Sequence, residues 1–177
     1  SRDVRIGVKV PDMIEEFLQA KAQDQASESY LTGLRQTLRR FATAFPGEIT
    51  HVQSNDIDRW LRSYQVSPVT RNSMLRCVKV FFSFAKTRSY LPRTEASAAE
   101  LVSLVKTGDT TTEIFQPDEL QKILLAAPRT AIPVLAIGGF AGLRAAEIER
   151  LDWSAVDLER RIITLRADQA KTASRRI

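Results

Sequence analysis

The sequence has few of the residues that stabilise small proteins through covalent or metal cross-links. Its 177 residues include one cysteine, Cys77, and one histidine, His51. A single cysteine excludes an internal disulfide framework, and one cysteine with one histidine is too small a set for a structural zinc site. No apolar run is long enough to span a bilayer, and the first residues lack the apolar stretch of a signal peptide. We therefore expect a cytoplasmic protein without a metal, folded around an ordinary hydrophobic core.

Acidic residues are missing from one long stretch of the chain. Between Arg59 and Thr94 there are eight lysines and arginines and no aspartate or glutamate. The whole chain has a formal charge of +5, and the excess lies in its first half. Such asymmetry favours a polyanionic partner, with a solvated basic face as the plain alternative.

In the N-terminal half, the spacing of apolar residues predicts helices. Apolar and polar residues nowhere alternate over a sustained stretch there, as they would in a strand. The expected helices cover residues 11–23, 27–45, 56–65 and 68–90. Ser54 and Ser67 suit the caps of the last two helices, and Pro92 follows the end of the fourth. These features predict a compact bundle.

The fourth of these helices carries a functional pattern. Its apolar residues share one face, and five polar residues gather within about 80° on the other face. This basic stripe consists of Asn72, Arg76, Lys79, Ser83 and Lys86. Its cations can reach successive phosphates, and its asparagine and serine can touch phosphates or base edges. Together with Arg71, and with Arg35 and Arg39 one turn apart on the second helix, the stripe predicts a DNA-binding surface.

Residues 93–116 are expected to form a linker with one short helical turn near residues 98–105. Beyond it, the pattern predicts a helix from Pro117, an apolar and therefore buried helix at 132–141, and a short helix at 145–151. Strands are expected at 162–165 and 175–177. Because a strand of three residues is short, we expect more of the fold to follow Ile177.

The stretch AGLRAAEIERLDWSAVDL, with Arg144 beside Gly142, resembles the first catalytic-arginine segment of the tyrosine recombinases, the phage-integrase family. IITL and KTASRRI are similar to the β-hairpin that carries the lysine of that family. EITHVQSNDIDRWL and SPVTRNSMLRCVKVFFSFAKTRSYLP resemble its helical core-binding domain. The resemblance implies a mainly α fold. A four-helix, SAM-like core-binding bundle at 1–92 and a linker at 93–116 would precede a truncated α+β catalytic domain at 117–177, with its β-hairpin near the C-terminus.

By the same resemblance, Arg144 is the first catalytic arginine, Glu147 the acidic residue that supports it, and Lys171 the hairpin lysine. The family uses no metal and no cofactor, and its nucleophile is a tyrosine that attacks a DNA phosphodiester. A guanidinium can hold two phosphate oxygens in a fork, and a lysine can protonate the leaving 5′-oxygen. Without the resemblance, the chemistry of the residue alone favours another interpretation, in which Arg144 donates hydrogen bonds to the free carbonyls at the end of a helix. The small residues before it are expected to leave room for a DNA backbone.

The family's His-x-x-Arg pair, its further His or Trp and its nucleophile are missing, since the tyrosines are Tyr30, Tyr64 and Tyr90, all in the helical half. We expect the parent protein to be a site-specific recombinase, tetrameric on double-stranded DNA. This chain is expected to bind DNA as a monomer without cleaving it. Two alternatives stay open: a non-catalytic DNA-binding module or regulator derived from an integrase, and a helical interaction protein with no nucleic-acid role.

Overall fold

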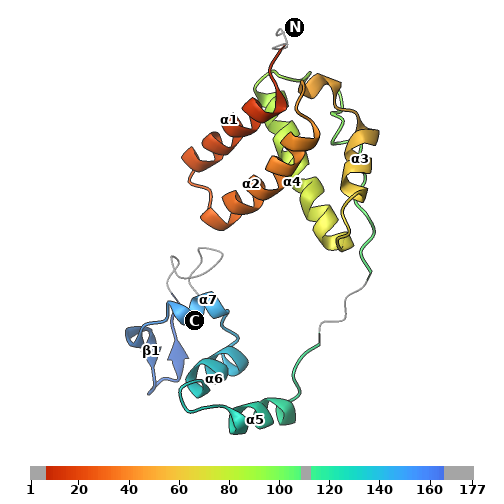
Figure 1. Ribbon diagram of the computed structural model, residues 1–177. Helices are drawn as coiled ribbons and strands as arrows, with labels where there is room; N and C mark the ends of the chain where they lie inside the picture. Colours follow the sequence, from red (N-terminus) through yellow and green to blue (C-terminus); the bar gives the residue numbers. More distant parts are fainter. Residues whose placement is uncertain (1–6, 109–112, 166–177) are drawn as a thin grey trace. The chain divides into compact units, whose positions relative to one another are not determined.

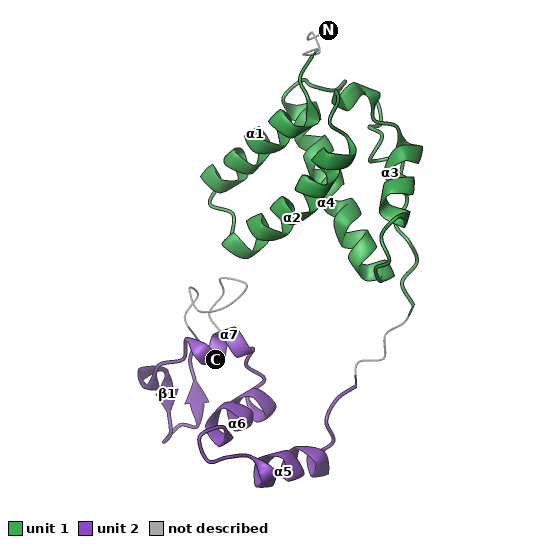
Figure 2. Cartoon of the chain, in the orientation of Figure 1, with its two compact units in different colours: residues 1–109 green, residues 110–177 purple. Residues whose placement is uncertain are grey.

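The computed structural model describes residues 7–108 and 113–165. The chain divides into two compact units, residues 1–109 and 110–177 (Figures 1 and 2). Within the described residues, no helix combines the length and the apolarity needed to cross a membrane.

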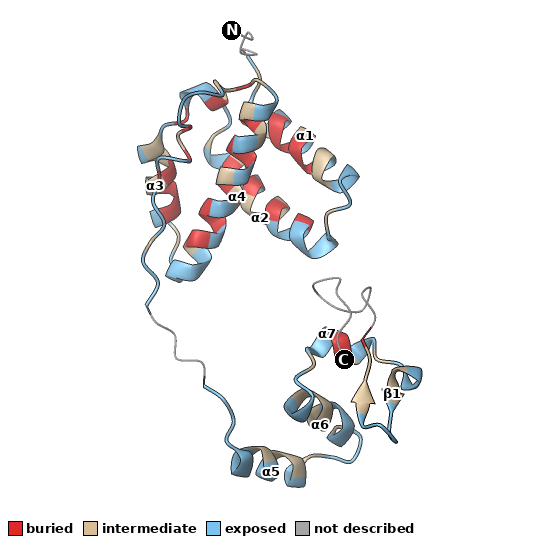
Figure 3. Cartoon of the chain, turned by 180° about the vertical axis from the view of Figure 1, so that it is seen from behind, coloured by how far each residue is buried: buried red, intermediate tan, exposed pale blue. Residues whose placement is uncertain are grey.

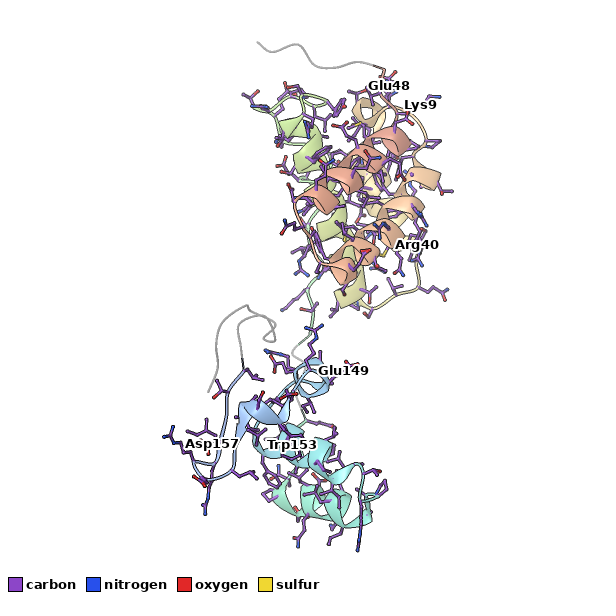
Figure 4. All side chains as sticks on the ribbon, turned by 90° about the vertical axis from the view of Figure 1, so that its left-hand side faces the viewer. Lys9, Arg40, Glu48, Glu149, Trp153 and Asp157 are labelled. Atoms are coloured by element: carbon purple, nitrogen blue, oxygen red, sulfur yellow. The ribbon has the colours of Figure 1, made fainter. Side chains whose placement is uncertain are left out.

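The N-terminal unit is a helical bundle, as predicted. Its elements are α1 (Val10–Gln23), α2 (Glu28–Ala44), the short 3-10 helix η1 (Ile49–His51), α3 (Ser54–Arg62) and α4 (Pro68–Thr87). The ends of the helices differ from the predicted ends by at most three residues. An isolated antiparallel bridge between Lys9 and Glu48 joins the start of α1 to the turn after α2 (Figure 4).

The helix caps show which local signals were correct. The hydroxyl of Ser67 accepts the backbone N–H of Thr70 at 3.2 Å, so the predicted cap of α4 is confirmed. The predicted cap at Ser54 is wrong, because Ser54 is already the first residue of α3. Helix α4 ends three residues early because Ser89 adopts a left-handed conformation with φ 63°, and the N–H of Tyr90 then bonds back to Ala85 O at 2.8 Å.

Aromatic rings fill the centre of the bundle. The ring of Phe41 lies 5.2 Å from that of Trp60, 6.3 Å from that of Phe81 and 6.1 Å from that of Phe82, in edge-on arrangements that aromatic pairs prefer. Figure 3 shows the buried residues along the faces that α1, α2, α3 and α4 turn toward one another. The core therefore forms from the apolar faces that periodicity had predicted.

The chain does not leave this unit where α4 ends. Residues 93–105, hereafter the strap, turn back along the bundle (Figure 1), and Ala99 and Val102 join the hydrophobic core. The compact unit extends to residue 109, past residue 92, and the division at residue 92 stays a prediction. The strap has the composition of a linker, but its small side chains fit closely against the bundle.

The C-terminal unit is built from short elements. They are α5 (Pro117–Ala126), α6 (Ile132–Phe140), α7 (Ala145–Glu149), η2 (Trp153–Ala155), β1 (Val156–Asp157) and β2 (Ile162–Ile163). The two strands form an antiparallel hairpin in which Val156 faces Ile163. The hairpin confirms the predicted fold class, but β1 was not predicted as a strand. The strand expected at 175–177 lies outside the described residues.

Burial in this unit differs from the prediction. Helix α6 was expected to be buried, yet neither α5 nor α6 has a buried residue within the described ranges, and Phe140 is 73% exposed. Gly138 and Gly139 serve helix packing: a Cβ on Gly139 would lie 3.1 Å from Leu120 of α5, and one on Gly138 would lie 3.5 Å from Ile148 of α7. Neighbouring helices use the space beside Gly138 and Gly139, whereas a Cβ on Gly142 would meet nothing within 4 Å, and the expectation that the small residues leave room for DNA stays a prediction.

Candidate nucleic-acid interface and arginine site

The basic stripe on α4 is only partly exposed. Arg76 and Ser83 are exposed, and Lys79 is half-buried. Asn72, at the other end of the stripe, is only 5% exposed and faces the strap. Its Nδ2 donates to Val105 O and its Oδ1 accepts from Val105 N, both at 2.8 Å. The hydrogen-bonding groups of Asn72 are thus already used inside the unit, and its predicted role in DNA binding stays a prediction.

Lys86 also has a partner that the helical pattern did not reveal. Its Nζ lies 3.0 Å from Oε2 of Glu100 in the strap, and its side chain is only 17% exposed. Hydrogen bonds from the backbone of Ser97 and from Lys86 lower the pKa of Glu100 to about 2, so this carboxylate stays charged at neutral pH. A carboxylate from beyond the run that lacks acidic residues therefore neutralises the basic stripe at this end.

Several other cations of the basic N-terminal half are also paired with carboxylates. Arg62 lies 2.7 Å from Asp58, and Arg88 lies 3.5 Å from Glu16. Of the predicted pair on α2, Arg35 lies 3.5 Å from Glu28. The long run without acidic residues is thus neutralised in part by carboxylates that precede or follow it in the sequence.

Several exposed cations without an ion pair within the described ranges lie on α2 and α4, two helices that pack together (Figure 1). Arg39 and Arg76 are exposed, and within the described ranges neither they nor Lys79 takes part in an ion pair. Arg40, labelled in Figure 4, is also exposed and stacks over the ring of Tyr64 at 5.7 Å. The sequence analysis did not include Arg40 among the DNA-binding residues, although its position next to Arg39 could have indicated it. Arg39, Arg40, Arg76, Lys79 and Ser83 are called the α2–α4 basic surface below.

Arg71 differs from these residues. It is half-buried, and its Nε is buried without a hydrogen-bond partner among the described residues. The structure does not place it with the exposed cations, and its predicted role in DNA binding stays a prediction.

Arg144 occupies the position before the first residue of α7. Gly142, with φ +64°, supplies the left-handed turn that separates this helix from α6. The backbone N–H of Arg144 donates to Oε2 of Glu147 at 2.9 Å, and its Nη1 donates to Oε1 of the same carboxylate at 3.0 Å. The three-residue spacing in the sequence therefore brings the predicted pair into direct contact.

The two members of this pair differ in exposure. Glu147 is 2% exposed, whereas the side chain of Arg144 is 54% exposed. The buried carboxylate of Glu147 holds Nη1 of the Arg144 guanidinium. Within the part of the chain that the structure describes, the other two guanidinium nitrogens have no partner. A guanidinium held in this way presents its free donors in a fixed orientation, which suits the binding of an oxyanion. Lys171, the third predicted catalytic residue, lies outside the described residues.

Cys77 offers no reactive thiol at neutral pH. Burial of its side chain between helices raises the pKa of the thiol, so the neutral form predominates.

Comparisons with known proteins show the fold. No protein-family model matches the sequence, and no curated protein matches it significantly. A lambda integrase dimer bound to a COC' core site matches 96% of this chain with a TM-score of 0.80 at 12% identity, over 61% of its own chain. A lambda integrase tetramer bound to a Holliday junction matches 96% with a TM-score of 0.78 at 13% identity, over 50% of its own chain.

The integrase of mycobacterium phage Brujita matches 86% of this chain, with a TM-score of 0.51 at 19% identity, over 53% of its own length. The chain thus spans about half to three-fifths of the integrases that it matches. At these identities the likeness concerns the fold, and it confirms the fold that the sequence resemblance implied.

Proposed function

We propose that this chain is part of a tyrosine-type, site-specific DNA recombinase, and that its described residues bind duplex DNA and supply the first catalytic arginine. The observation that carries the proposal is the integrase fold over 96% of the chain, with Arg144 at the start of a helix and held by a buried carboxylate. Two of the solved structures that share this fold are lambda integrase bound to a core site and to a Holliday junction.

DNA binding is assigned to the α2–α4 basic surface. Its cations lack carboxylate partners within the described ranges, so they are free to neutralise phosphates, and Ser83 adds a neutral donor on the same face of α4. Lys86 contributes less than its position suggests, because a phosphate would have to displace Glu100 from it.

Arg144 is assigned to the reacting phosphate. When a tyrosine oxygen attacks the phosphorus in line, negative charge grows on the non-bridging oxygens, and the fixed guanidinium stabilises that charge. The attack forms a 3′-phosphotyrosyl bond and breaks the bond to the 5′-oxygen, which takes a proton and leaves as a hydroxyl. Lys171 is assigned the donation of that proton. Glu147 acts through Arg144 as a positioning residue.

This sequence lacks a His-x-x-Arg pair and has no tyrosine outside the helical unit. We therefore propose that the chain alone binds DNA as a monomer without cleaving it. Cleavage and assembly into a tetramer on DNA would belong to a chain that also carries those groups. We also propose a cytoplasmic, nucleoid-associated location of the bacterial or phage type, and a chemistry that needs no metal or cofactor.

A nicked suicide substrate tests the proposal. The longest reading frame that contains these residues is incubated with duplex DNA carrying a nick beside the cleavage site, so that a covalent adduct cannot religate. A protein–DNA adduct through the 3′-phosphate supports the recombinase. Binding without an adduct supports the alternative, a non-catalytic module derived from an integrase, and absence of binding contradicts both.

A further inference from the structure

Tyr64 lies in the turn between α3 and α4, and its ring is held against the core of the bundle. It packs edge-on against Trp60, with the two ring centroids 5.5 Å apart and the ring planes at 83°. Trp60 is buried, and its ring lies 5.2 Å from that of Phe41 in α2. The turn is also tied down, because the hydroxyl of Ser63 donates to Trp60 O at 2.7 Å. The orientation of the Tyr64 ring is therefore fixed from the inside of the unit.

The other partner of this ring is Arg40, which is labelled in Figure 4. Its guanidinium carbon lies 5.7 Å from the centroid of the Tyr64 ring, within the range of a cation–π contact. Arg40 is exposed, and within the described ranges its guanidinium takes part in no hydrogen bond or ion pair. Stacking occupies the flat face of a guanidinium and leaves the N–H donors at its edge free. Arg40 is thus held in place and keeps the donors that bind an oxyanion.

Two other exposed arginines of this unit lack one half of that combination. Arg39, next to Arg40 in α2, has no aromatic ring against it among the described residues. Arg88 lies over the ring of Phe84 at 5.3 Å, but it also pairs with Glu16 at 3.5 Å. Among these three arginines, only Arg40 joins a restrained guanidinium to donors that are free within the described residues.

We propose that Tyr64 is a positioning residue for Arg40, and that the two form a preorganised site for one phosphate of the DNA backbone within the α2–α4 basic surface. The assignment rests on the proposed binding of duplex DNA. An arginine that moves freely loses side-chain freedom when a phosphate immobilises it, and this loss weakens binding. Because the ring of Tyr64 already restrains Arg40, less freedom is lost, and the phosphate meets a guanidinium in a fixed orientation.

Loss of the arginine and loss of the ring should therefore have different effects. Arg40→Ala deletes a phosphate contact, so the magnitude of the slope of log K against log salt should fall by about 0.9. Tyr64→Leu keeps the charge but releases the guanidinium, so the slope should be unchanged while the affinity falls about two- to fivefold. Tyr64→Phe keeps the ring and should bind like the wild type.

Binding of the whole chain to a short duplex of random sequence, measured over a range of salt concentrations, tests the pair. The loss caused by Tyr64→Leu should be absent in an Arg40→Ala background and should persist in an Arg39→Ala background, which is the matched control. An equal loss in the two backgrounds would overturn the proposal, because Tyr64 would then act through the stability of the bundle. A slope that Arg40→Ala leaves unchanged would overturn it as well.

NMR of the free chain supplies a measurement that needs no DNA. The ring current of Tyr64 should move the Hδ protons of Arg40 upfield in the wild type and in Tyr64→Phe, and Tyr64→Leu should remove this shift. Unshifted protons in the wild type would overturn the proposal even where Tyr64→Leu does not fold. If the wild type binds no duplex, the proposed function fails together with the phosphate site. Normal binding that Arg40→Ala does not change removes the phosphate site alone.

Discussion

Glu100 and Lys86 form an ion pair between the strap and α4, with Oε2 of the carboxylate 3.0 Å from Nζ of the lysine. The same carboxylate accepts the backbone N–H of Ser97 at 2.6 Å. One side chain thus shapes the turn of the strap and also neutralises a cation that the sequence pattern had assigned to DNA.

The first prediction concerns stability in acid. The pKa of Glu100 is about 2 in the folded chain, against about 4.3 for an unperturbed glutamate. Because the folded value is the lower one, this stabilisation is present above about pH 4.5 and is lost as the pH falls toward 2. The urea midpoint of the wild type should therefore fall more steeply over this range than that of Glu100→Gln. Glu95→Gln, another glutamate of the strap, is the control, and parallel curves for wild type and Glu100→Gln would contradict the prediction.

The second prediction concerns the packing of α5 on α6. Gly139→Val would place side-chain atoms where Leu120 already lies, with the Cβ alone at 3.1 Å, so we expect destabilisation of the C-terminal unit by about 1–3 kcal/mol. Gly33→Ala in α2 is the matched control, because a Cβ there meets nothing within 4 Å, and alanine should stabilise that helix by about 0.5–1 kcal/mol. Hydrogen exchange of α5 and α2 measures the two effects. Unchanged protection of α5 in Gly139→Val would show that the close approach is unimportant.

The third prediction concerns Arg144 and rests on the suicide-substrate assay. Arg144→Ala should lower the rate of covalent capture about 100- to 1,000-fold while leaving DNA affinity nearly unchanged, because the guanidinium acts on charge that grows during the reaction. Arg144→Lys should not restore capture, since an ammonium lacks the planar fork.

Glu147→Gln should reduce capture less than Arg144→Ala does, because it weakens only the hold on the guanidinium. Arg160→Ala, an exposed arginine paired with Asp157 at 3.8 Å, is the control and should capture normally. Equal capture by Arg144→Ala and Arg160→Ala would remove Arg144 from the proposed mechanism.

Local signals in the sequence predicted much of the fold. The spacing of apolar residues located the four helices of the bundle, and Ser67 marked the start of α4 because capping depends on residues three positions apart. The contact between Arg144 and Glu147 was predictable for the same reason, since the residue that precedes a helix lies close to the side chain three positions later, as in a capping box.

Contacts between distant residues could not be predicted in this way. Asn72 fits the exposed face of α4 on a helical wheel, but its partner Val105 lies 33 positions away. Glu100 likewise reaches Lys86 from fourteen positions away. A periodic pattern reports which side chains share a face, and it does not report which other segment covers that face.

The salt dependence of duplex DNA binding tests the central claim most directly. In the double variant Arg76→Ala/Lys79→Ala, the magnitude of the slope of log K against log salt should fall by about 2, since each phosphate contact contributes about 0.9. Lys86→Ala should lower it less, because Glu100 already pairs with that lysine, and Arg62→Ala, a control paired with Asp58 at 2.7 Å, should leave it unchanged. An unchanged slope in the double variant would contradict the account, because the α2–α4 basic surface would then be only a solvated face.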